Sequence, residues 1–127
     1  MGLPKCNRLK HPKTFQAIYQ KGKRHQSDHL MLRILSPRDQ NQAVKPTQFG
    51  ISVSQKVSKK AVKRNRIKRQ LQGIINTCLP RIGLGYQVVI VVKRNAMECK
   101  YEHFLRELKE LLINAEIIHG HKREYLL

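Results

Sequence analysis

The sequence predicts a single domain of the α+β class, in which helices pack on one sheet. Its 127 residues fit one domain, and apolar residues make up 40% of the chain, which is enough for a modest core. Segments with helical periodicity are mixed along the chain with short β-branched or alternating segments. Because no interdomain linker separates them, we expect residues 1–127 to form one α/β sandwich.

The first element expected is a short helix over residues 13–21. Phe15, Ile18 and Tyr19 recur there at the i, i+3 and i+4 spacing of one helix face. Gly22 follows directly and is a typical C-terminal stop for a helix. The spacing and the stop together predict the helix and its end.

Three strands are expected, over residues 30–35, 49–53 and 86–92. The last is the clearest, because its β-branched run is nearly continuous, which is typical of a strand in the middle of a sheet. In strand 49–53, Gly50 and the serines that follow it at alternate positions share one face. Small residues there predict that another part of the molecule approaches that face closely.

Two longer helices are expected in the second half of the chain. The first begins at Ser58 as its N-cap and runs to about residue 79, because Pro80 cannot continue it. The second covers residues 101–115, with a stripe of apolar side chains along one face. Its acids are expected on the exposed face, at Glu102, Glu107 and Glu110.

The basic segment 56–69 is the most informative part of the chain. It holds eight Lys or Arg in fourteen residues and no acid, within a chain whose formal charge is +18. Residues 40–97 contain no acid at all. A fixed array of cations on a helix suits the regular phosphate spacing of a polyanion, so nucleic acid is the first partner expected.

The first long helix should divide into two halves. One arc carries the apolar residues Ala61, Ile67, Leu71, Ile74, Ile75 and Cys78. The same arc carries the cations Lys60, Arg64 and Lys68, and the adjoining arc carries Lys59, Lys63 and Arg66. Because burying three unpaired cations is too costly, the C-terminal half should pack on the sheet while the N-terminal half projects past it.

Several other classes of function are disfavoured. The longest apolar run, residues 88–92, is too short to span a bilayer, and the N-terminus lacks a signal-peptide apolar region, so we expect a cytoplasmic protein without a membrane partner. The three widely spaced cysteines form no CxxC pair, so we expect free thiols and no metal site. We expect no catalytic residue, because the basic region offers no carboxylate for phosphodiester hydrolysis.

The ordered motifs resemble those of the bacterial ribonuclease P protein family. The core of the resemblance is Arg64-Asn65-Arg66 followed by Lys68-Arg69. Further matches occur in order around it, at Asn7-Arg8-Leu9, at Phe15, Tyr19 and Gly22, at residues 49–54 and at residues 86–90. The resemblance covers residues 6–115, whereas residues 116–127 have no match and their structure is left unassigned.

The resemblance implies a fold and a role. The fold is an αβββαβα sandwich with an unusual left-handed crossover near the basic helix. The role is to assist a catalytic RNA that removes the 5′ leader of precursor tRNA. The partners implied are the ribonuclease P RNA and precursor tRNA. No cofactor is expected in the protein itself, and magnesium is expected with the RNA subunit.

The resemblance also implies two groups of binding residues. Contacts with RNA are expected from the basic helix and from the residues that lead into it, at Lys59, Lys60, Lys63, Arg64, Asn65, Arg66, Lys68 and Arg69. A cleft for the single-stranded leader is expected at Phe15, Tyr19, Ser52, Ser54 and Lys56. The two aromatic residues can stack on bases. The alternative interpretation of Phe15 is that its ring packs in the core.

Other functions fit the composition less well. A basic ribosomal protein with a structural role on ribosomal RNA is the main alternative, although such proteins often carry their charge on long tails. A DNA-binding regulator is disfavoured, because the sequence shows neither a helix-turn-helix pair nor a dimer seam. A protein-only nuclease is the least expected, since the carboxylates it would need are missing from the basic region.

Overall fold

The computed structural model describes residues 3–36 and 45–118 of the chain. The helices are α1 (Pro12–Lys21), α2 (Ala61–Cys78) and α3 (Tyr101–Asn114), and the strands are β1 (Lys23–Gln26), β2 (Leu30–Leu35), β3 (Gln48–Ser52) and β4 (Gln87–Val92). Short 3-10 turns occur at Lys5–Asn7, Leu79–Arg81 and Arg94–Glu98. The order of helices and strands is αβββαβα, as expected. Residues 37–44, between β2 and β3, and the tail from residue 119 lie outside the described residues.

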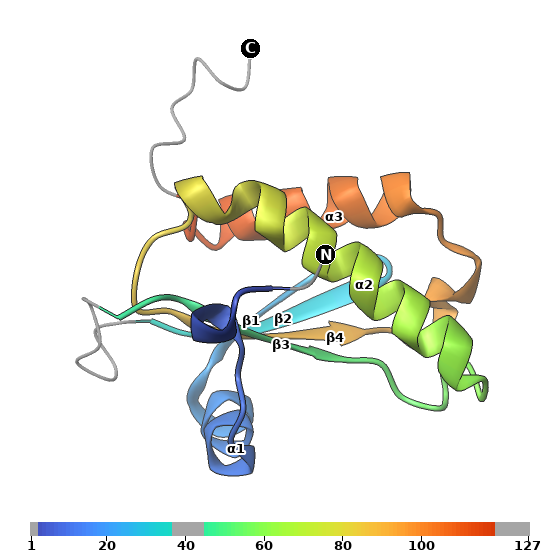
Figure 1. Ribbon diagram of the computed structural model, residues 1–127, viewed down its shortest axis with the longest axis horizontal. Coiled ribbons are helices and arrows are strands. Elements are labelled where there is room, and N and C mark those ends of the chain that lie inside the picture. Colours follow the sequence, from blue (N-terminus) through green and yellow to red (C-terminus); the bar gives the residue numbers. More distant parts are fainter. Residues whose placement is uncertain (1–2, 37–44, 119–127) are drawn as a thin grey trace.

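The strands form one sheet in the order β1-β2-β4-β3. β1, β2 and β4 run antiparallel to their neighbours, while β3 is parallel to β4. The interior position of β4 confirms the prediction from its continuous apolar run, and Val88, Val89 and Ile90 are fully buried. Helices α2 and α3 cover one face of the sheet and α1 lies against the other (Figure 1).

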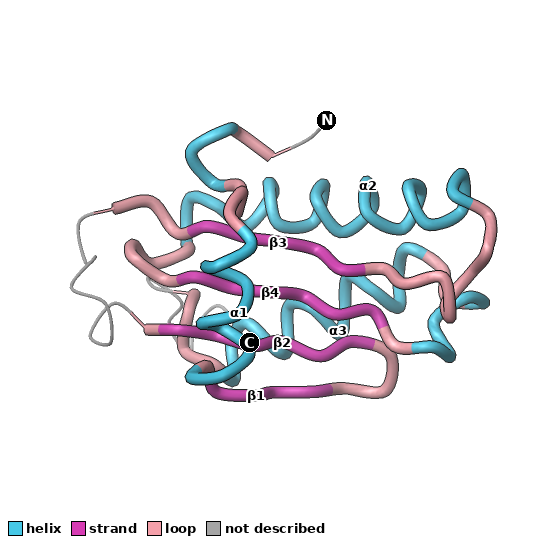
Figure 2. The backbone as a smooth tube through the Cα atoms, turned by 90° about the horizontal axis from the view of Figure 1, so that it is seen from below, coloured by secondary structure: helices cyan, strands magenta, loops and turns pink. Residues whose placement is uncertain are grey.

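The connection from β3 through α2 to β4 is a left-handed crossover. The two strands are parallel neighbours, and the views from two sides show α2 on the face opposite α1 (Figures 1 and 2). Right-handed crossovers are the rule for parallel strands, so the hand observed here is a rare exception that the family resemblance predicted. This path starts α2 beyond the C-terminal end of β3, where its first turns extend past the sheet (Figure 1).

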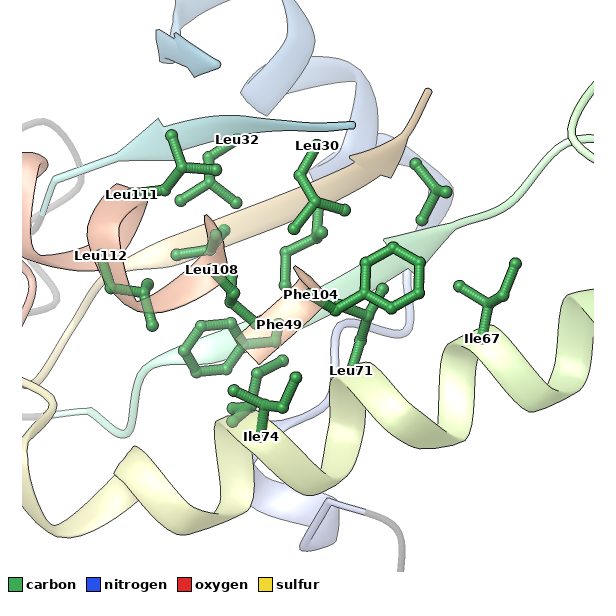
Figure 3. Packing of buried hydrophobic residues seen from close by; sticks show 14 of the residues in the cluster. Leu30, Leu32, Phe49, Ile67, Leu71, Ile74, Phe104, Leu108, Leu111 and Leu112 are labelled. Atoms are coloured by element: carbon green, nitrogen blue, oxygen red, sulfur yellow. The ribbon is translucent and has the colours of Figure 1, made fainter. Parts of the chain in front are cut away.

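The main core lies between the sheet and the two long helices. Leu71 and Ile74 of α2 and Phe104 and Leu108 of α3 are fully buried against side chains of the sheet such as Leu32 (Figure 3). Burying each of these side chains contributes about 1.5–3 kcal/mol. The apolar arc from Ile67 to Cys78 is buried as predicted, so this half of α2 is anchored firmly enough to hold the other half in place.

A smaller cluster joins α1 to the opposite face of the sheet. Ile18, Leu35 and Val89 are buried there, and Phe15 packs against them. A methyl group added at Gly50 would lie 2.6 Å from the ring of Phe15, which confirms the close approach predicted from the small residues of β3. Helix α1 crosses only one half of this face, as Figure 2 shows.

Gly50→Ala is therefore expected to destabilise the protein by about 1–3 kcal/mol, because the added methyl would force Phe15 and α1 away from the sheet. Urea unfolding checks this value. The matched control is Gly73→Ala, since a methyl group at Gly73 of α2 meets nothing within 4 Å. The control should be neutral or stabilising, because alanine favours a helix. Equal stability of Gly50→Ala and the unsubstituted protein would contradict the close packing of α1.

Three predictions about the elements were incomplete or wrong. Ser58 is not the N-cap of α2, because its hydroxyl accepts the N–H of Lys60 in a preceding turn and the helix begins at Ala61. Ala61 is exposed rather than buried, since the first turn lies beyond the sheet. β1 was not predicted from its own residues, because the sequence Lys-Arg-His-Gln gives no apolar alternation on this edge strand.

Candidate nucleic-acid interface

The first half of α2 and the loop before it display an array of cations. Six of the eight predicted RNA-contact residues are exposed, namely Lys59, Lys60, Lys63, Asn65, Arg66 and Arg69. The other two, Arg64 and Lys68, are half-buried. Within the described residues, no acid forms an ion pair with any of these cations. The structure thus brings all eight residues together on one helix and its approach, without internal charge compensation.

Arg64 has a structural role in addition to its charge. Its Nη1 donates hydrogen bonds to the carbonyl oxygens of Ser58 and Lys59, at 2.9 and 3.0 Å. These bonds fasten the approach loop to the first turn of α2, which has no side-chain N-cap. Arg64 therefore orders the loop that carries two of the other cations, and its replacement would change more than one contact.

The five residues predicted for the leader cleft lie on or next to the α1 side of the sheet. Phe15 is half-buried against Gly50, while Tyr19 is 39% exposed. Ser52 lies two positions beyond Gly50 on the same face of β3. Ser54 and Lys56 are exposed in the loop that follows β3, where the Ser54 hydroxyl accepts the N–H of Lys56.

A cavity of about 310 Å³ lies at the N-terminal end of α1. Its walls contain none of the five predicted cleft residues; they are formed by Lys5, Cys6, Leu9, Lys10, His11, Thr14 and Gln48. The uncovered half of the sheet face and this cavity are thus separate features on the α1 side. The binding of a leader by these five residues together stays a prediction.

Arg33 is a residue of this face that the sequence reasoning missed. It lies on β2 opposite Val89, and its Nη1 donates a hydrogen bond of 3.1 Å to the carbonyl oxygen of Tyr19. Its guanidinium carbon lies 5.9 Å from the centre of the Tyr19 ring, within range of a cation–π interaction. Its Nε is buried and has no hydrogen-bond partner among the described residues. The sequence signal that could have identified Arg33 is its position as a cation between the apolar residues Leu32 and Ile34 of a predicted strand.

Glu107 of α3 is buried, which contradicts its predicted place on the exposed face of that helix. Only 3% of the residue is exposed, although Glu102 and Glu110 are exposed as predicted. Its carboxylate accepts hydrogen bonds from the Ser27 hydroxyl, from the His29 N–H at 2.8 Å and from His29 Nδ1 at 2.6 Å. Burial by itself would raise the pKa of Glu107, but these hydrogen bonds lower it below its ordinary value.

The three cysteines are free, as predicted. Cys6 is exposed, Cys78 is buried on α2 and Cys99 is half-buried between the Arg94–Glu98 turn and α3. Burial raises the pKa of both the Cys78 and the Cys99 thiols. Among the helices of the described residues, none has the length and apolar character needed to cross a membrane.

Known proteins match the chain both in sequence and in fold. It is 62% identical to the ribonuclease P protein component of Rippkaea orientalis, with both chains covered in full. It is 54% identical to the protein of the same description from Microcystis aeruginosa, over 95% of this chain and all of the other. The solved ribonuclease P protein from Staphylococcus aureus superposes with a TM-score of 0.75 at 25% identity, over 96% of this chain and all of that one.

The family-level comparison covers nearly the whole of the described structure. The model of the family described as Ribonuclease P matches residues 3–116. The solved ribonuclease P protein from Thermotoga maritima, at 22% identity, has the same fold with a TM-score of 0.73, over 84% of this chain and 96% of that one. The matched range includes the basic helix, the sheet and α1, so every element of the candidate interface lies within it. The chain belongs to the ribonuclease P protein family.

Proposed function

We propose that this chain binds the catalytic RNA of ribonuclease P through the basic helix and the 5′ leader of precursor tRNA through the α1 face. In this role it is the non-catalytic subunit of an endoribonuclease. The observation that carries the proposal is the array of cations on α2, which have no acidic partner among the described residues, in a chain that belongs to this family. Because the buried half of α2 is fixed in the core, the cations are held in place before RNA binds.

The α1 face suits a single strand better than a duplex. Single-stranded RNA is typically held by aromatic side chains that stack on bases beside cations that follow the backbone. Tyr19 offers an exposed ring, and Arg33 places a guanidinium charge 5.9 Å from the centre of that ring. Ser52 is small, so it leaves room for a base or sugar over β3. We therefore add Arg33 to the residues proposed to contact the leader.

Phe15 has a different part in the proposal. Its ring lies against Gly50 and the smaller cluster, so it mainly fixes α1 on the sheet and thereby positions Tyr19. Catalysis is assigned to the RNA subunit, together with the magnesium ions that phosphodiester hydrolysis needs. The protein is assigned to the cytoplasm with its RNA partners. The alternative role as a ribosomal protein is not favoured by the family match.

Tyr19→Ala is expected to weaken binding of precursor tRNA to the holoenzyme by about 1–3 kcal/mol, because one stacking platform for the leader is lost. Binding of mature tRNA, which has no leader, should stay nearly unchanged. Measuring both affinities together with thermal stability separates a binding role from a packing role. If Tyr19 served only to pack the core, stability would fall and both RNAs would be affected alike.

Tyr101→Ala provides the matched control for this experiment. Tyr101 is 42% exposed, close to the 39% of Tyr19, but it begins α3 on the other side of the sheet. Its replacement should leave both affinities unchanged. Equal losses for precursor and mature tRNA with Tyr19→Ala would refute the leader assignment while leaving the role of α2 intact.

A further inference from the structure

Three potential metal ligands lie close together between the β1–β2 turn and α3, and none of them belongs to the basic helix. They are His29 in the turn between β1 and β2, Cys99 just before α3, and Glu107 within α3. One ligand atom from each lies within 4.8 Å of the other two. The fold brings together an imidazole nitrogen, a thiol sulfur and a carboxylate oxygen from three different elements.

We propose that His29, Cys99 and Glu107 form a binding site for a divalent transition-metal ion of the zinc type. Nitrogen, sulfur and oxygen donors of this kind are the ligands that zinc takes in proteins, whereas magnesium and calcium prefer oxygen alone. Three protein ligands leave a fourth tetrahedral position for water or another ligand. The site is independent of the proposed role in RNA binding.

The present geometry needs only a small adjustment to bind such an ion. Bonds of about 2.0 Å to nitrogen and oxygen and about 2.3 Å to sulfur place tetrahedral donors roughly 3.3–3.5 Å apart. The His29 Nδ1 and Glu107 Oε2 atoms, now 2.6 Å apart, would separate slightly, and the Cys99 sulfur already lies within 4.8 Å of both ligands. A cavity of about 260 Å³ lies beside the cluster, with Ser27, Arg106 and Glu107 in its wall.

Metal binding would rearrange two protons. The Glu107 carboxylate is ionised and can only accept, so the Nδ1 of His29 carries the hydrogen of their bond. On binding, that proton moves to Nε2 and the Nδ1 lone pair binds the ion. The Cys99 thiol releases its proton to solvent and binds as thiolate.

The groups around the three ligands orient the carboxylate and affect the charge balance of the site. The second carboxylate oxygen, Oε1, keeps its hydrogen bonds from the Ser27 hydroxyl and the His29 N–H, which orient Glu107. Lys93 lies close by, since its Nζ donates a bond of 2.6 Å to the carbonyl oxygen of Ser27. This cation opposes a dication, but the thiolate and carboxylate together supply two negative charges that balance it.

Cobalt(II) titration of the untagged full-length protein tests the proposal. A cobalt–thiolate bond gives a charge-transfer band in the near ultraviolet, and zinc should displace the cobalt and remove the band. Cys99→Ser should abolish the band and weaken cobalt binding by about tenfold or more, since replacing even an outer-shell partner of a metal ligand costs that much. Glu107→Gln should weaken binding by a similar factor.

Two control variants test whether cobalt binds to other potential ligands of the chain. Cys6→Ser removes an exposed thiol outside the cluster and should keep the band unchanged. Replacing His119 and His121 by alanine removes two histidines that one residue separates in the sequence and that could also bind cobalt, and it should keep the band as well. Absence of the band in the unsubstituted protein, or its survival in Cys99→Ser, would overturn the proposal whatever the stability of the variants.

Discussion

Replacing Lys63, Arg66 and Arg69 together by glutamine is expected to weaken binding of ribonuclease P RNA by about 100- to 2,000-fold, at roughly 1–1.5 kcal/mol per lost contact, the upper part of the range for an ordinary hydrogen bond. All three side chains are exposed on α2 and have no acidic partner in the described structure. Because all three side chains are exposed, folding stability should be nearly unaffected. Filter binding at several salt concentrations measures the loss.

The salt dependence should change in the same variant. If the protein neutralises about six phosphates, log K falls with log salt at a slope of roughly −4 to −5, using about 0.7–0.9 per contact. Removing three contacts should reduce the magnitude of that slope by about 2–3. A slope near zero for the unsubstituted protein would contradict the electrostatic interface itself.

The matched control changes the same number and kinds of charge elsewhere. Arg94, Arg106 and Lys109 are exposed cations on the Arg94–Glu98 turn and α3, and none of them belongs to α2 or to the loop before it. Replacing all three by glutamine lowers the net charge equally and should retain most of the affinity. Equal losses in the two triple variants would show that net charge, rather than the array on α2, determines binding.

Glu107→Ala is expected to reduce the free energy of unfolding by about 2–4 kcal/mol at neutral pH. The substitution leaves the His29 N–H and the Ser27 hydroxyl without their buried acceptor, and each such loss costs about 1–3 kcal/mol. Urea unfolding measures the difference. Glu110→Ala is the control, because Glu110 lies three residues further along α3 and is exposed. It should change stability by less than about 0.5 kcal/mol.

The contribution of Glu107 should also depend on pH in a defined direction. Its pKa in the folded protein is lowered from the ordinary value of 4.5, so the folded state favours the ionised form. Its stabilising effect is therefore complete above about pH 4.5 and is lost as the pH falls through the lower, folded-state pKa. The unsubstituted protein should lose more stability on acidification than Glu107→Gln does, and parallel pH profiles would contradict this.

Elements with strong local patterns could be predicted from the sequence. The continuous β-branched run of β4 indicated an interior strand, and the apolar arc of α2 indicated which half is buried; both predictions are confirmed. Gly50 indicated a close approach because only a small residue fits under the ring of Phe15. The N-cap of α2 was misjudged by two residues, Ser58 instead of Lys60, since a serine can close a turn before a helix as readily as it can cap one.

Features that depend on tertiary contacts could not be predicted. Glu107 occupies a helix position next to the apolar stripe, and only the fold places the turn at Ser27 and His29 over it. Cys99 is seventy residues from His29, so no local spacing indicated that they meet. β1 lacks an apolar pattern and exists because β2 offers its free edge for pairing. Arg33 was overlooked because its role depends on Tyr19 from another element.

The most direct test of the central claim is cleavage of precursor tRNA while magnesium is titrated. Three samples are compared: a bacterial ribonuclease P RNA alone, this protein alone, and the two together. The account predicts that the protein alone cleaves nothing and that its addition lowers the magnesium concentration at which the RNA removes the leader. Cleavage by the RNA-free protein that survives repurification, or a magnesium requirement that the protein leaves unchanged, would contradict it.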